Sequence, residues 1–95
     1  MAMSSYDLKQ LVAAFGADFR GVQDRLYEAL TGDLPDSELP DALADARRKL
    51  ADYEELLARA ELDELDREYV RETWGERVDT LRERAAALAA KLGGA

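Results

Sequence analysis

Apolar residues recur along the first third of the chain at the spacing of one helix face. Between residues 5 and 31 the steps alternate between four and three positions, through Leu8, Val12, Phe15, Phe19, Val22, Leu26 and Ala29. Because an α-helix repeats every 3.6 residues, this stripe predicts an amphipathic helix. Gly16 and Gly21 weaken a helix interior, so we expect one bent helix, with a break near Gly16 as the alternative.

Two further segments carry stripes of the same kind. The one over 38–60 consists of Leu39, Leu43, Ala46, Leu50, Tyr53, Leu57 and Ala60. The one over 63–92 consists of Leu65, Tyr69, Trp74 (or Thr73), Val78, Leu81, Ala85, Leu88 and Leu92. Gly75 is a possible break in this third helix. No stripe can be buried alone, and short connections make neighbouring helices antiparallel. The sequence therefore predicts an all-α fold, an up-down-up three-helix bundle with coiled-coil-like packing, as a single domain over 1–95.

Start and stop signals mark the ends of these segments. Ser4 or Ser5 can cap the first helix, and Gly32 is placed to end it in a left-handed conformation. An acidic loop rich in proline and glycine follows over 32–38. Asp63 can cap the third helix, with Asp66 three residues on, as a carboxylate version of the capping box.

The net charge of −8 is concentrated in two places. Residues 32–41 and residues 61–68 each sum to −4, and in an antiparallel bundle these segments lie at opposite ends. One interpretation is that the acids complement the dipoles at helix N-termini. The other is that the second segment forms an acidic recognition end, made of Glu61, Asp63, Glu64, Asp66 and Glu68.

Composition removes most kinds of chemistry. The chain has no cysteine and no histidine, so we expect no enzyme activity, no cofactor and no metal site. The acidic excess argues against direct nucleic-acid binding, since phosphate contacts need surplus Lys and Arg. The only basic cluster, Arg47 to Lys49, is interpreted as surface ion pairs of Asp45 with Lys49 and of Arg48 with Asp52. No segment is apolar enough for a membrane span or a signal sequence, so the expected location is cytoplasmic.

A comparison of helix lengths predicts self-association. At 1.5 Å per residue the third helix outruns the second by about two turns, over residues 85–92. Leu88 and Leu92 continue the apolar stripe there, covered either by the 32–39 loop or by another subunit. With Trp74, they are the candidate apolar anchors of an interface.

The sequence thus favours a non-catalytic helical adaptor or assembly protein that acts by protein–protein contact, with itself as the expected partner. Two alternatives stay open. One is an acidic regulator, or a DNA-mimic inhibitor of a nucleic-acid-processing partner. The other is a small virus assembly or packaging subunit, an alternative that rests only on analogy with small acidic helical proteins of similar size.

Overall fold

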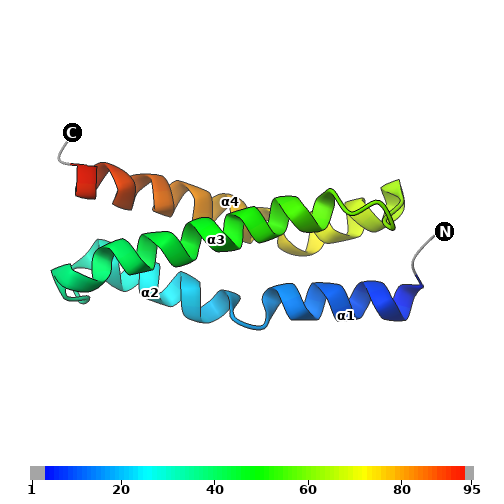
Figure 1. Ribbon diagram of the computed structural model, residues 1–95, viewed down its shortest axis with the longest axis horizontal. Coiled ribbons are helices and arrows are strands. Elements are labelled where there is room, and N and C mark those ends of the chain that lie inside the picture. Colours follow the sequence, from blue (N-terminus) through cyan, green and yellow to red (C-terminus); the bar gives the residue numbers. More distant parts are fainter. Residues whose placement is uncertain (1–3, 94–95) are drawn as a thin grey trace.

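The computed structural model describes residues 4–93, which form four α-helices arranged as three rods (Figure 1). The first rod is made of α1 (Ser5–Gly16) and α2 (Phe19–Thr31), which follow one another along nearly the same line. After a short 3-10 turn, η1 (Asp36–Glu38), α3 (Leu39–Leu57) runs back beside them, and α4 (Glu64–Gly93) reverses direction again. The predicted all-α, up-down-up three-helix bundle is confirmed. None of the described helices combines the length and the apolar character that a membrane crossing requires.

Three of the predicted start and stop signals are confirmed in atomic detail. The Ser4 hydroxyl accepts a hydrogen bond from the Asp7 backbone N–H at 3.1 Å, which caps α1. Gly32 ends α2 with φ of 86°, a left-handed conformation that favours glycine. At the start of α4, Asp63 and Asp66 exchange hydrogen bonds between side chains and backbone N–H groups. These contacts satisfy backbone donors that helix ends would otherwise leave free.

The first rod differs from the predicted single bent helix, because it is broken at Ala17 and Asp18. The stripe nevertheless keeps its phase across the break, and every member of it is buried: Leu8, Val12, Phe15, Phe19, Val22, Leu26 and Ala29. The expectation of one bent helix was wrong. The alternative of a break near Gly16 is confirmed.

The second rod, α3, is shorter than predicted. It ends at Leu57 rather than at residue 60, and a turn over 58–63 connects it to α4. The reason is a side chain from the next helix. Arg67 donates a hydrogen bond from Nε to the Leu57 carbonyl at 2.9 Å and another from Nη2 to the Arg59 carbonyl at 3.4 Å. The two carbonyls thus receive hydrogen bonds from the Arg67 guanidinium in place of the backbone N–H groups that a further helical turn would supply.

The third rod, α4, is continuous through Gly75, so the possible break there does not occur. Its buried side chains are Val70, Val78, Leu81, Ala85 and Leu88. The predicted start of the stripe was wrong, since Leu65 is 75% exposed and Tyr69 is 39% exposed. Val70 is fully buried in their place. The core face of α4 is therefore rotated, and Leu65 and Tyr69 point away from the bundle.

Candidate functional site

The junction between α1 and α2 is where an aromatic side chain from α4 meets the first rod. Trp74 is half-buried. It packs edge-on against Phe15, with ring centroids 5.4 Å apart, and in a tilted arrangement against Phe19, with centroids 4.9 Å apart. A Cβ atom at Gly16 would overlap the Trp74 ring. Glycine is therefore needed at this position for close approach, and Trp74 serves as part of the core.

The polar part of the junction is Lys49, which is only 5% exposed. Its ammonium donates a hydrogen bond to the Phe15 carbonyl at 2.6 Å and pairs with the Asp18 carboxylate at 2.5 Å. It also lies 4.6 Å from the centre of the Phe15 ring. The break leaves the Phe15 carbonyl without a backbone donor, and Lys49 supplies the missing hydrogen bond.

This burial corrects the interpretation of Lys49 as an exposed partner of Asp45. Asp45 instead accepts from Arg25 at 3.0 Å and from Arg48 at 3.2 Å. Asp52 lies 3.9 Å from the Lys49 ammonium. The predicted ion pair of Arg48 with Asp52 is not formed, because Arg48 pairs with Asp45 instead. The ion pairs of α3 therefore tie it to the first rod as well as along its own surface.

Two titratable groups at the junction respond to these surroundings. The hydrogen bond from Lys49 holds the pKa of the Asp18 carboxyl below its usual value of 3.8. Burial raises the pKa of the Tyr53 hydroxyl above its usual value of 10.0. Tyr53 lies against Phe15, with ring centroids 5.8 Å apart. Both environments favour the ordinary protonation states at neutral pH, which suits a structural role.

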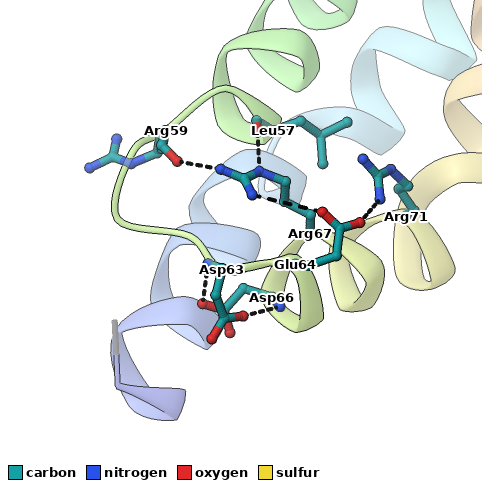
Figure 2. Close-up of polar contacts among 7 residues, drawn as sticks. All are labelled: Leu57, Arg59, Asp63, Glu64, Asp66, Arg67 and Arg71. Carbon is teal, nitrogen blue, oxygen red and sulfur yellow. Dashed lines mark hydrogen bonds and ion pairs between the residues drawn. The ribbon is translucent and has the colours of Figure 1, made fainter. Parts of the chain in front are cut away.

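The predicted acidic recognition end spans the turn over 58–63 and the start of α4, and Figure 2 shows three of its acids in contacts within the chain. Asp63 and Asp66 form the cap, with the Asp66 N–H donating to Asp63 Oδ1 at 2.8 Å. Glu64 pairs with Arg71 at 3.1 Å and lies 3.9 Å from Arg67. These three carboxylates hold the turn together, and two of them, Glu64 and Asp66, lie in the first turn of α4, where the helix dipole favours acids.

The remaining two predicted acids of this end differ from each other. Glu61 pairs with Arg59 at 2.8 Å, so it also has a partner in the turn. Glu68 is exposed, and among residues 4–93 no cation pairs with it. The structure therefore does not gather the five acids into a shared site.

The predicted apolar anchors Leu88 and Leu92 are separated by the fold. Leu88 is fully buried within the single chain, whereas Leu92 is 38% exposed. Leu34 and Leu39 belong to or pack against the same core, and Lys91 reaches the Ala29 carbonyl at 3.4 Å. Of the two covers expected for this part of α4, the 32–39 loop or another subunit, the structure favours the first, because Leu88 is already buried within the single chain. Leu88 cannot contact a partner without unfolding this end.

The arginines of α4 all point to partners at the sides of the helix. Arg67 bonds the Leu57 carbonyl, Arg71 pairs with Glu64, and Arg82 pairs with Glu54 at 3.4 Å and Asp79 at 2.8 Å. The other two lie over aromatic rings, Arg77 at 5.0 Å from the Trp74 ring centre and Arg84 at 5.6 Å from that of Tyr27. Each of these arginines thus faces a neighbouring group of the bundle, as Lys91 does at the Ala29 carbonyl.

What remains on the outside of α4 is a second stripe, opposite the core face. We call it the outer stripe, and it consists of Leu65, Tyr69, Glu72, Glu76 and Glu83. All five are exposed, and within residues 4–93 no ion pair engages Glu72, Glu76 or Glu83. The sequence interpretation missed this stripe because the charges of residues 69–95 nearly cancel in sum. The available signal was the 4-3-4 spacing of Leu65, Tyr69, Glu72 and Glu76.

Among residues 4–93 no group of three or more acidic side chains is arranged to hold a metal ion. A shallow cleft of ≈ 560 Å³ opens beside the junction, lined by Lys49, Asp52, Glu55, Arg59 and Glu61 together with apolar neighbours. The buried Lys49 ammonium in its wall is already bonded to Phe15 and Asp18.

Comparison of the chain with protein-family models, with curated proteins and with solved structures finds no match.

Proposed function

We propose that this chain is a non-catalytic helical protein that acts by protein–protein contact through the outer face of α4. The observation that carries the proposal is the exposure of Leu65, at 75%, next to Tyr69 on the same face. Large apolar side chains that continue a helical face without being covered are typical of contact surfaces. The junction and the turn over 58–63, by contrast, use their polar groups to hold the fold.

A partner other than a second copy fits this face better. The outer stripe is acidic apart from Leu65 and Tyr69, so two copies meeting through it would bring like charges together. Self-association through other surfaces stays a prediction, and sedimentation at increasing protein concentration tests it. The alternative of an acidic inhibitor of a nucleic-acid-processing protein draws on the same three glutamates. Competition between this protein and DNA for that partner would favour the alternative.

Photo-crosslinking in the cells that produce the protein tests the proposal directly. A benzophenone amino acid is placed at Tyr69, where an aromatic ring is already exposed, and at Tyr27 as a matched position on α2. We expect a discrete protein adduct from position 69 and none of the same mass from position 27. Adducts at a multiple of the 10.6 kDa chain mass would identify self-association.

One outcome of this crosslinking experiment would contradict the proposal. If position 69 gives no adduct beyond those of position 27, while both proteins are folded and abundant, the outer face of α4 is not a contact surface. Circular dichroism of both variants establishes that the bundle is intact.

A further inference from the structure

The outer stripe has a charge that the rest of α4 does not neutralise. Five arginines lie on this helix, and each is bound by a carbonyl, a carboxylate or an aromatic ring at the flanks. The glutamates at 72, 76 and 83 therefore face solvent without a cation among the described residues. A surface with this separation attracts positive groups from outside.

The stripe also has a length and spacing suited to a helix. It runs from Leu65 to Glu83 along one continuous helix, a distance of about 27 Å at 1.5 Å per residue. Residues spaced four and three apart form the ridge that a second helix packs beside. The apolar pair lies at the N-terminal end of α4, and the acids follow toward its middle.

From these features we infer that the outer stripe binds a basic amphipathic helix of a partner protein. Apolar side chains of the partner would cover Leu65 and Tyr69, and its Lys or Arg side chains would pair with Glu72, Glu76 and Glu83. This inference rests on the proposed function and adds the chemistry of the partner. Nucleic acids and anionic lipid surfaces carry negative charge, so the same glutamates repel them.

A synthetic peptide provides the probe. It is a helix of about 20 residues with leucines on one face at one end and lysines on that face over the remainder. The control is a peptide of identical composition in scrambled order, which has the same charge but no continuous face of leucines and lysines. Binding is measured by fluorescence anisotropy with the full chain, at low and at moderate salt. We expect the patterned peptide to bind more tightly than the scrambled one, with an affinity that falls as salt increases.

Two variants with the same change in net charge locate the binding surface. The first is Glu72→Gln, Glu76→Gln and Glu83→Gln together. The matched control is Glu28→Gln, Asp41→Asn and Glu55→Gln, three exposed acids on α2 and α3 that have no ion pair among residues 4–93. We expect the first variant to weaken binding by about tenfold and the control by less than about twofold.

A third comparison tests the apolar end. Leu65→Ala is expected to weaken binding of the patterned peptide, and Tyr6→Ala, at an equally exposed position on α1, is expected to leave it unchanged. Equal weakening by the two charge variants, or equal binding of the two peptides, would overturn the inference. Adducts at position 69 without selective peptide binding would retain the proposed function and reject a basic helix as its partner.

Discussion

Gly16 shows how a single missing side chain shapes the first rod. The Trp74 indole occupies the space that a Cβ at this position would need. Gly21, five residues on, has open space around its own Cβ position. The two glycines looked equivalent as interruptions of a helical stripe, yet only the first is required by packing.

Alanine substitution should separate these two roles. Gly16→Ala is expected to lower the free energy of unfolding by about 1–3 kcal/mol, because the aromatic cluster must move to admit a methyl group. Gly21→Ala is expected to raise it by about 0.5–1 kcal/mol, because alanine favours the helix and meets no neighbour. Urea denaturation of both variants measures the two changes. Equal effects of the same sign would show that the Trp74 contact does not constrain Gly16.

At the scale of elements, the junction joins two short helices by contacts from a third. Lys49 on α3 contacts both sides of the break: it donates a hydrogen bond to the Phe15 carbonyl in the last turn of α1 and pairs with Asp18, the residue just before α2. A buried ammonium is costly unless it is paired and hydrogen-bonded, so Asp18 is part of the same arrangement. The break between α1 and α2 is therefore supported by α3 and α4 together.

The pairing of Asp18 predicts a pH dependence of stability. Its pKa is lower in the folded chain than the usual 3.8, so its stabilising effect is present above that value and disappears as the pH falls through the folded pKa. Asp18→Asn should therefore be less stable than wild type at pH 7, and the difference should narrow as the pH falls below 3.8 toward the lower folded pKa. Urea unfolding from pH 7 to pH 3 measures this difference. Asp24→Asn is the control, because Asp24 lies exposed on α2 with only a distant ion pair, 3.9 Å from Arg20. A gap that persists unchanged into acid would contradict the pairing of Asp18 with Lys49.

The sequence predicted the elements better than it predicted their contacts. The first stripe was correct at every position because one uninterrupted pattern defines its phase. On α4 the adjacent residues Tyr69 and Val70 are both apolar, so two overlapping phases were available, and the structure buries Val70. Lys49 was unpredictable from polarity alone, because a long aliphatic stem can fill a core position while its charge finds partners from other helices. The outer stripe depends on where the arginines point, which only the packed bundle determines.

At the scale of the whole molecule, the bundle is an elongated body with extents of 47 × 23 × 17 Å. Its two acidic segments lie at opposite ends, where the connections between rods are found (Figure 1). α4 extends along the bundle, and the core positions of its C-terminal half are buried by the same chain as far as Leu88. The end of the bundle near the 32–38 loop is thus closed without a second subunit.

This closure can be tested by shortening two leucines. Leu88→Ala is expected to lower the free energy of unfolding by about 2–5 kcal/mol, since it leaves a cavity in the core. Leu92→Ala, four residues on and partly exposed, should change it by about 0.5 kcal/mol or less. Chemical denaturation of the two variants provides the comparison. Similar losses, or a loss at Leu88 that disappears on dilution, would point to an interface at this end.

The separation of arginines and glutamates around α4 has a consequence for how the molecule meets other proteins. A helix with cations held at its flanks and carboxylates on its outer side has a transverse asymmetry of charge. Near a positive surface such a body experiences a torque that turns the outer side forward before any contact is made. Encounters would then begin in the productive orientation more often than by random tumbling, and the association rate would slow as added salt shortens the range of that force.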